Sequence, residues 1–291
     1  MAPARPVLVS VLIVNYHAYA ELSDCLHSLA PFLTGDVEVI VVDHAGDAAS
    51  AASLRDRHPW VQLIAVQDNP GFAAGVNRAA RTAAGEYFLL LNPDCLVKHD
   101  VMHVLADWLD RHGHVGVAGA LVREPDGSIQ PSARRFPNLT TGFAGRTTWM
   151  SRLWPGNPWT RRNLVVADGG EPVVVDWVTG ACMMIRRRAF EAVGGMDERF
   201  FLYWEDADLC ARLGAAGWPT VYCTQAAVTH LTSRSSAHAP TQSLVAFHQS
   251  AYRYFRKHSR HAALASPFVF LLLYGRLALK LAWNWLRTGS G

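Results

Sequence analysis

Four short apolar runs, separated by segments with helical spacing, constrain the fold of this 291-residue chain more than any other feature. The runs are rich in β-branched residues and cover residues 7–14, 37–42, 61–66 and 87–91. The segments 21–29 and 75–84 repeat apolar residues at helical intervals. Strands that alternate with helices form sheets covered by helices. The pattern therefore predicts an α/β fold in which helices flank a mostly parallel central sheet.

The second half of the chain extends this pattern. Strands are expected over 115–122, 173–178 and 182–185, and helices over 100–111 and 204–216. Periodicity fades from residue 131 to residue 170. That stretch is rich in Arg and Trp, a composition suited to contact with sugar rings and phosphates.

Composition excludes several classes of protein. With 50% hydrophobic and 18% charged residues, the chain can fill a core and is not intrinsically disordered. A net charge of +3 on dispersed Lys and Arg residues does not predict a nucleic-acid partner. The five cysteines include no Cys-x-x-Cys pair, so we expect neither a disulfide framework nor a thiolate zinc site, and a reducing cytosol fits best. No signal peptide is expected.

Polar residues follow each of the first four apolar runs, at the edge where parallel sheets bind ligands. They are Asn15 and Tyr16, Asp43 and His44, Asp68 and Asn69, and Asn92 and Asp94. Together they predict a single cleft, although Asn and Asp also form ordinary turns after strands. The loop that follows the first run contains no glycine, which excludes a dinucleotide fingerprint and a P-loop there.

Asp94 is the candidate ligand for a divalent cation. Pro93 holds it rigidly after the fourth run. Mg²⁺ commonly takes one or two protein carboxylates and completes its shell with phosphate and water. His230 is the candidate second ligand, with an ordinary structural role as the alternative.

The densest acidic cluster directly follows an aromatic run over 200–204. Glu205, Asp206 and Asp208 open a predicted helix, where acids also serve as simple caps. Aromatic neighbours desolvate a carboxylate and raise its proton affinity, which suits a general base. Asp208 precedes Arg212 by four residues, so we expect those two side chains to pair on the helix.

Together these motifs resemble inverting family 2 glycosyltransferases with the GT-A fold. The matching segments occur in the family's order and cover 14–16, 41–43, 69–77, 91–94, 180–181, 194–201, 205–209 and His230. The most similar branch is the rhamnosyltransferases that extend lipid-linked sugars in bacterial cell-envelope synthesis, through 126–128, 131–134 and 158–160. Two departures concern Asn92, which replaces the first acid of the family's Asp-x-Asp motif, and His44-Ala45, which replaces the usual Asn-x.

The resemblance implies a role for individual residues. Asp206 would be the catalytic base, with Glu205 next in line, and Asp94 with His230 would bind Mg²⁺ or Mn²⁺. The implied residues for the nucleotide-sugar are Asn15, Asp43, Asn69, Gly75, Asn77, Asn92 and Asp94. The candidates for acceptor binding are Trp177, Arg134 and Trp204.

The resemblance also implies a function. The chain would move a sugar, with L-rhamnose from dTDP-rhamnose as the first expectation and a UDP-sugar as another donor, to a lipid-linked or polysaccharide acceptor. Residues 1–100 would bind the donor, residues 101–238 would hold the acceptor and the catalytic acids, and residues 239–291 would form a helical tail. Two alternatives are a catalytically silent protein that binds carbohydrate or nucleotide-sugar on the same fold, and a sugar nucleotidyltransferase.

The C-terminal segment has the pattern of a helix at a membrane surface. Residues 262–275 carry no charge, but this stretch is shorter than the ~18 residues of a spanning helix and contains Pro267, so we expect an interruption and no span. At ~100° per residue, three cations share one helical face: Arg276, Lys280 and Arg287. Such a helix would hold a cytoplasmic enzyme on the inner face of the cell membrane. Packing on the domain or within a homodimer is the alternative.

Overall fold

The computed structural model covers the whole chain and describes residues 6–137, 164–165, 168–231 and 240–288. Most of the Arg- and Trp-rich stretch expected to contact sugars and phosphates lies at 138–163, outside the described residues.

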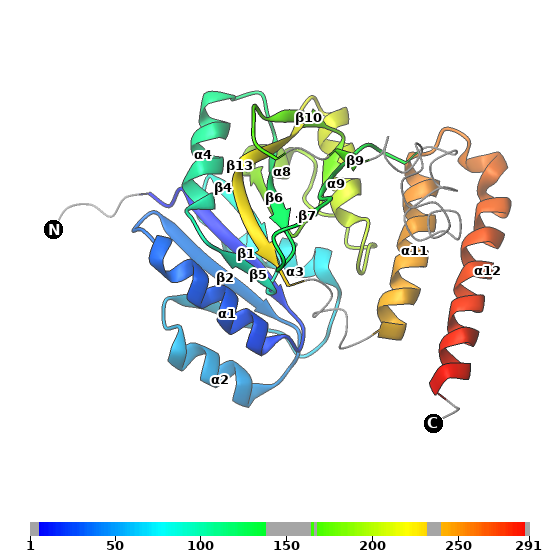
Figure 1. Cartoon of the computed structure of the whole chain (residues 1–291), viewed down its shortest axis with the longest axis horizontal. Helices are drawn as coiled ribbons and strands as arrows, with labels where there is room; N and C mark the ends of the chain where they lie inside the picture. The colour runs from blue at the N-terminus through cyan, green and yellow to red at the C-terminus, as the bar shows by residue number, and fades with distance from the viewer. Residues whose placement is uncertain (1–5, 138–163, 166–167, 232–239, 289–291) are drawn as a thin grey trace.

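A ten-stranded sheet forms the centre of the molecule (Figure 1). Its main path runs in the order β10-β13-β6-β12-β4-β1-β2-β3. The first-half strands are β1 (Val9–Asn15), β2 (Val37–Asp43), β3 (Val61–Ala65), β4 (Tyr87–Leu91) and β5 (Cys95–Val97). The second-half strands are β6 (Val117–Arg123), β7 (Ile129–Gln130), β10 (Val173–Val175), β12 (Cys182–Arg186) and β13 (Thr220–His230).

The two halves of the chain share this sheet. Strands β3, β2, β1 and β4 are parallel, and β12 then enters antiparallel between β4 and β6. A three-stranded sheet lies beside it and contains β8 (Ala133–Arg134), β9 (Leu164–Val165) and β11 (Trp177–Val178). Because β12 begins where β4 ends, the turn before β12 lies at the same edge as the ends of β1, β2 and β4.

Helices cover both faces of the sheet. They are α1 (Tyr19–Leu29), α2 (Ala48–Arg57), α3 (Phe72–Thr82), α4 (Val101–Arg111), α8 (Arg187–Ala192) and α9 (Glu205–Ala215). The alternation of β1 divides the core: Val11 and Ile13 pack with α1 and α4, whereas Leu12 packs with α3 and α9 on the other face. Each fully buried aliphatic side chain contributes roughly 1.5–3 kcal/mol relative to exposure.

Most expected elements lie within two or three residues of their predicted bounds. The run 173–178 is instead two strands, β10 and β11, with a break at Asp176. The Asp176 carboxylate accepts hydrogen bonds from the Arg135 side chain and from the Phe136 N–H. Helix α2 was not predicted, since its exposed residues carry little apolar pattern; Asp47 caps it by accepting from Ala49 and Ser50.

Two further helices, α11 (Pro240–His258) and α12 (Ala262–Thr288), run antiparallel beside the α/β body, with α12 outermost (Figure 1). The expected interruption at Pro267 is wrong: α12 continues through it for 27 residues. Pro267 lies close to the helix start, so the carbonyl that its ring leaves unpaired belongs to the first turn. By length and composition, Ala262–Leu286 is long and apolar enough to cross a membrane.

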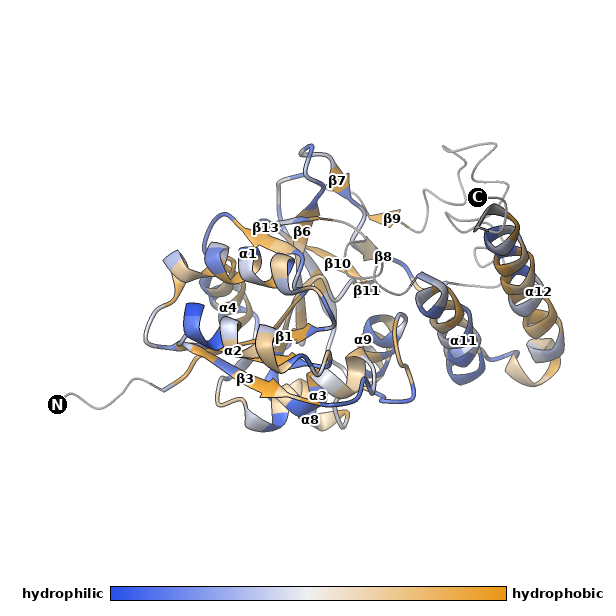
Figure 2. Cartoon of the chain, turned by 90° about the horizontal axis from the view of Figure 1, so that it is seen from below, coloured by the Kyte–Doolittle hydropathy of each residue, from blue (hydrophilic) through white to orange (hydrophobic). Residues whose placement is uncertain are grey.

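The cations of α12 also differ from expectation. Arg276 and Lys280 are half-buried, and burial together with their charges lowers the pKa of His248 on α11 against an opposing hydrogen bond to the Leu244 carbonyl. They are the only charged residues between 262 and 286. The outward face of α12 therefore carries no charge along this length, and Figure 2 shows it as largely hydrophobic.

Candidate functional site

The ends of β1 and β2 meet at one edge of the sheet. Parallel register places Asn15 opposite Asp43, and the Asn15 side-chain N–H donates to an Asp43 carboxylate oxygen at 2.9 Å. The Tyr19 hydroxyl donates to the other oxygen at 2.7 Å. Both Asn15 and Asp43 are buried. The structure thus brings this predicted pair together at the carboxyl edge, where ligands bind in parallel sheets.

Gly75 allows α3 to approach β1 closely. A Cβ at this position would lie 2.8 Å from the Val14 methyl groups and 2.9 Å from Cε1 of His44. Burial lowers the pKa of His44, so its ring is neutral at pH 7. Asn69 accepts from the Gly71 N–H at 3.0 Å and shapes the turn before α3. Gly75 therefore has a packing role, and Asn69 lies in the loop beside the strand ends.

Asn77 lies two residues after Gly75 on α3. Its amide donates to the Met196 carbonyl and accepts from the Met196 N–H, both at 2.9 Å, and it also donates to Glu198. Because both ends of the amide are used, the structure assigns Asn77 to bracing the segment that leads to the acids, in place of the expected contact with diphosphate.

Asp94 and His230 lie in direct contact although 136 residues separate them. Pairing of β5 with β13 sets Cys95 opposite His230, and an Asp94 carboxylate oxygen lies 3.0 Å from His230 Nε2. His230 Nδ1 lies 2.9 Å from the Gln130 side-chain oxygen, which orients the ring. Asn92 Nδ2 is 3.5 Å from His230 Nε2. The structure therefore joins the two predicted metal ligands at the end of β4.

This donor set fits a hard divalent cation that shares its shell with phosphate. Within the described part of the chain, no group of three or more His, Cys, Asp and Glu side chains could hold a metal. One carboxylate and one imidazole are nevertheless sufficient when diphosphate oxygens and water supply the other positions. Asn92 contributes a neutral amide beside them, so the protein supplies less negative charge than an Asp-x-Asp motif would.

Helix α9 begins after a strained turn. Tyr203 and Trp204 have φ values of 67° and 70°, the left-handed region that residues other than glycine seldom adopt. Each such residue costs on the order of 1–3 kcal/mol and persists only where its surroundings hold it. The Trp204 carbonyl accepts from the Asp208 N–H at 2.9 Å, so this turn sets the direction of the first turn of α9.

The two acids that follow this turn occupy a desolvated position. Burial raises the pKa of Asp206, while the N–H groups of Ala207 and Gly180 and the Arg134 guanidinium oppose the shift. Burial and the Asp206 carboxylate raise the pKa of Glu205 well above its usual range. Glu205 is 6% exposed and its Oε2 has no hydrogen-bond partner among the described residues, whereas Asp206 is partly exposed. Asp206 is thus the acid that a substrate can reach.

Asp208 is a structural acid, as its spacing from Arg212 predicted. The Arg212 Nε donates to it at 2.8 Å. Lys257 and His258 of α11 each contact its other oxygen at 2.7 Å. Burial opposes ionisation, but these hydrogen bonds together lower the pKa of Asp208. Sequence reasoning missed both α11 partners, because no local pattern links residues 50 positions apart.

One turn connects the acids with the end of β4. The Gly180 N–H donates to an Asp206 carboxylate oxygen at 3.2 Å. The carbonyl of the next residue, Ala181, accepts from the Asn92 N–H at 3.0 Å. Since adjacent Cα atoms are about 3.8 Å apart, the segment that holds Asp206 and the loop that holds Asp94 converge on this turn.

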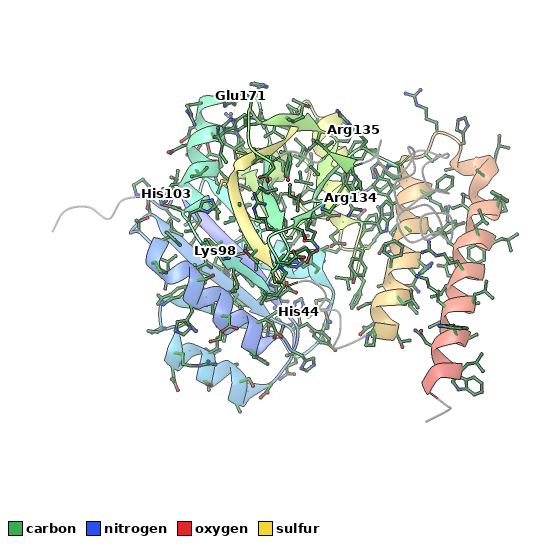
Figure 3. All side chains as sticks on the ribbon, in the orientation of Figure 1. His44, Lys98, His103, Arg134, Arg135 and Glu171 are labelled. Atoms are coloured by element: carbon green, nitrogen blue, oxygen red, sulfur yellow. The ribbon has the colours of Figure 1, made fainter. Side chains whose placement is uncertain are left out.

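The candidate acceptor residues lie in two places. The Arg134 guanidinium lies over the Trp177 ring at 5.2 Å, and Trp177 Nε1 donates to the Arg135 carbonyl. Figure 3 shows Arg134 and Arg135 on the side of the sheet that faces α11. Trp204 instead packs against Phe247 and Tyr254 of α11. Arg134 and Trp177 therefore form one cluster near Asp206, and Trp204 supports the turn.

Comparisons with known proteins also indicate a glycosyltransferase. Residues 5–245 match a family model described as "Glycosyltransferase like family 2". The chain is 33% identical to the N-acetylglucosaminyl-diphospho-decaprenol L-rhamnosyltransferase of Mycobacterium tuberculosis over 286 residues, 94% of this chain and 91% of the relative. It is 30% identical to rhamnosyltransferase WbbL of Escherichia coli K12 over 145 residues, 50% of this chain and 52% of that protein.

Solved structures resemble the whole chain. The mannosyltransferase PcManGT from Pyrobaculum calidifontis, in complex with GDP-Man and Mn²⁺, aligns with a TM-score of 0.58 at 18% identity, over 99% of this chain and 82% of its own. The expected GT-A fold is confirmed by this likeness.

Proposed function

Because the chain belongs to glycosyltransferase-like family 2, we propose that it is an inverting hexosyltransferase that moves L-rhamnose from dTDP-rhamnose to a lipid-linked acceptor in cell-envelope synthesis. The rhamnosyltransferase relatives support the choice of sugar and acceptor. The observation that best supports this reaction is the turn at Gly180 and Ala181. This turn makes hydrogen bonds with Asp206 on one side and with Asn92, after the end of β4, on the other.

Asp206 acts as the general base in this proposal. Its raised pKa and its partial exposure suit it to take a proton from an acceptor hydroxyl. As the proton leaves, the acceptor oxygen attacks the anomeric carbon from the face opposite the nucleotide diphosphate. The bond to the diphosphate breaks in the same displacement, and the configuration inverts. Arg134 and Trp177, beside Asp206, would position the acceptor.

The donor would bind along the strand ends. Asn15 and Asp43 would flank the nucleotide, with Asn69 and Asn92 towards the diphosphate. Asp94 and His230 would hold a divalent cation, Mg²⁺ or Mn²⁺. When bound, such a cation neutralises charge that develops on the departing diphosphate.

The outward face of α12 would lie on the membrane. Leu264, Leu271 and Leu279 on this face are 88%, 69% and 75% exposed, and Trp283 lies near its C-terminal end. An uncharged face of this length is suited to the boundary between headgroups and acyl chains. The arrangement would keep a cytoplasmic enzyme on the inner membrane surface, close to a lipid-linked acceptor.

Liposome flotation tests the membrane contact. The double variant Leu271→Asp, Leu279→Asp should lose flotation with anionic vesicles, while Trp60→Asp on the α/β body should float as the parent does. If the double variant instead converts a dimer into a monomer on size exclusion without changing flotation, the face is a homodimer interface and the membrane proposal is wrong.

Transfer assays test the reaction. We expect rhamnose transfer from dTDP-rhamnose to N-acetylglucosaminyl diphosphoryl polyprenol in the presence of Mg²⁺ or Mn²⁺, with loss of transfer in Asp94→Ala. Donor binding without turnover on any acceptor would favour the silent binding protein. Formation of a nucleotide-sugar from a nucleoside triphosphate would favour a nucleotidyltransferase, although the missing glycine-rich loop after β1 argues against it.

A further inference from the structure

Helix α11 contacts the strained turn that precedes the two acids. Ser250, which is buried, donates its hydroxyl to the Leu202 carbonyl at 3.0 Å. The Trp204 ring packs at 5.1 Å from Tyr254 and 6.0 Å from Phe247, centroid to centroid. These contacts hold the backbone on the N-terminal side of Glu205 and Asp206, where two left-handed residues follow each other.

The same helix also holds the other side of the acids. Lys257 and His258, in its last turn, contact Asp208, which is 0% exposed. Lys257 additionally bonds Asp197 at 2.7 Å, in the segment that leads into the turn. Glu205 and Asp206 therefore lie between two points that α11 fixes.

We propose that α11 positions the catalytic acid, with Ser250 and Lys257 as positioning residues that act through Leu202 and Asp208. The inference rests on the proposed function, in which Asp206 is the base. The family match ends at residue 245, so both residues lie beyond the part of the chain that it covers. Helix α11, which directly precedes α12, therefore contributes to the active site.

Loss of the Ser250 hydroxyl leaves the Leu202 carbonyl without its side-chain donor and lets the turn relax. Asp206 then loses its alignment with the acceptor hydroxyl, and a small misplacement of a reacting group has a large effect on rate. The donor side is unaffected, because Asn15, Asp43 and Asp94 are held by the sheet and by His230. The expected signature is a fall in kcat with an unchanged KM for the donor.

The test compares Ser250→Ala with Ser243→Ala, a buried serine on the same helix without a side-chain hydrogen bond among the described residues. We expect kcat to fall about tenfold in Ser250→Ala and to stay within twofold in Ser243→Ala, with donor KM unchanged in both. Ser250→Thr, which keeps the hydroxyl, should recover most of the loss.

The pH profile separates positioning from simple destabilisation. The charged groups beside Asp206 are Glu205 and Arg134, and Ser250→Ala removes neither. A relaxed turn admits water to Asp206, so the acid limb of kcat should move to lower pH. A merely structural role would reduce activity equally at every pH. Lys257→Met, at a less buried position, is the second variant and should also lower kcat with the donor KM unchanged.

Hydrogen exchange keeps the test independent of activity. Amides at the start of α9, including the Asp208 N–H that bonds Trp204, should exchange faster in Ser250→Ala than in Ser243→Ala. Equal exchange and equal kcat in these two variants would overturn the positioning role. If the parent protein transfers no sugar but the exchange difference is present, the proposed function fails while the role of α11 in holding the turn stands.

Discussion

The donor side and the acid side of the site are built in different ways. On the donor side, Asn15 and Asp43 end neighbouring parallel strands and bond each other, so sheet register alone brings them together. On the acid side, Asp206 follows two left-handed residues and depends on Gly180 and on a turn held by Ser250. One part is fixed by backbone pairing and the other by side chains from distant segments.

Because of this difference, the two sides of the site should respond differently to substitutions. A strand end keeps its position as long as the sheet is intact, so substitutions there change chemistry locally. A turn that is strained by itself keeps its position only through its supports, so a distant substitution changes the rate while the sheet stays folded.

The largest effect is expected at Asp206. Asp206→Asn keeps the shape of the side chain and its acceptor oxygen for the Gly180 N–H, but it cannot take a proton. Turnover should fall by about 10²-fold or more, the scale of a lost general base, while donor affinity by thermal shift stays the same. Normal turnover in this variant would show that Asp206 is not the base and would assign that role to Glu205.

Asp94→Ala should have the next largest effect. It removes the buried carboxylate that contacts His230 and that, within the described residues, is the acidic candidate for the cation. We expect kcat/KM to fall by about 10- to 100-fold, together with the metal-dependent part of the thermal shift given by dTDP. Asp126→Ala, an exposed acid in a turn, is the control and should bind the donor as the parent does. A dTDP shift that is equally metal-dependent in Asp94→Ala would place the cation elsewhere.

The pH dependence of kcat gives a third test. A base works only when deprotonated, and burial raises the pKa of Asp206, so the acid limb should lie above the usual aspartate range of about 3.9. Glu205 contributes to the same desolvated site, and in Glu205→Gln only one of the two acids remains. Because burial and the Asp206 carboxylate raise the pKa of Glu205 well above its usual range, Glu205 is still protonated while Asp206 ionises, and the limb should keep its position in Glu205→Gln. A limb that moves to lower pH would show that Glu205 is already ionised when Asp206 titrates.

Local pattern accounts for what the sequence could predict. Apolar runs and their polar ends fixed β1 to β4 and placed Asn15, Asp43 and Asp94 at one edge, because strand period and register follow from neighbouring residues. The pairing of Asp208 with Arg212 was equally local. His230 was predicted as a second ligand with a structural role as the alternative, and only the tertiary fold brings it into contact with Asp94, since 136 residues separate them.

Long-range packing accounts for what the sequence could not predict. Nothing near Ser250 or Lys257 indicates that they contact the turn and helix that carry the acids. Asn77 has the residue type of a ligand contact, yet its amide bonds Met196. In α12, Arg276 and Lys280 share one helical face as expected, but which face meets α11 depends on the tertiary fold.

The contacts of Asp208 with Arg212 and with α11 should contribute to the free energy of unfolding. Asp208→Asn removes a buried charge that Arg212, Lys257 and His258 contact, and breaking such a buried pair lowers the free energy of unfolding by roughly 3–5 kcal/mol. The folded-state pKa of Asp208 is lowered, so its contribution is present above the unfolded value of about 3.9 and is lost as pH falls through the lower folded value. Urea unfolding should therefore separate parent and variant at pH 7 and much less near pH 3. The same separation at both values would mean that the charge of Asp208 does not matter.

The smallest effect on donor binding is expected at Asn77. This variant tests whether Asn77 belongs to the acid side of the site or to the donor side. Asn77→Ala leaves the Met196 N–H and carbonyl without their partner, which should lower the free energy of unfolding by about 1–3 kcal/mol. Donor affinity should stay within twofold, because this amide faces the 195–198 segment. Asn69→Ala, in the loop beside the strand ends, should weaken donor binding more than Asn77→Ala does and lower the free energy of unfolding less. If Asn77→Ala weakened dTDP-sugar binding while the protein kept its stability, Asn77 would belong to the donor side after all, and bracing of the acid side would have to come from the α11 contacts alone.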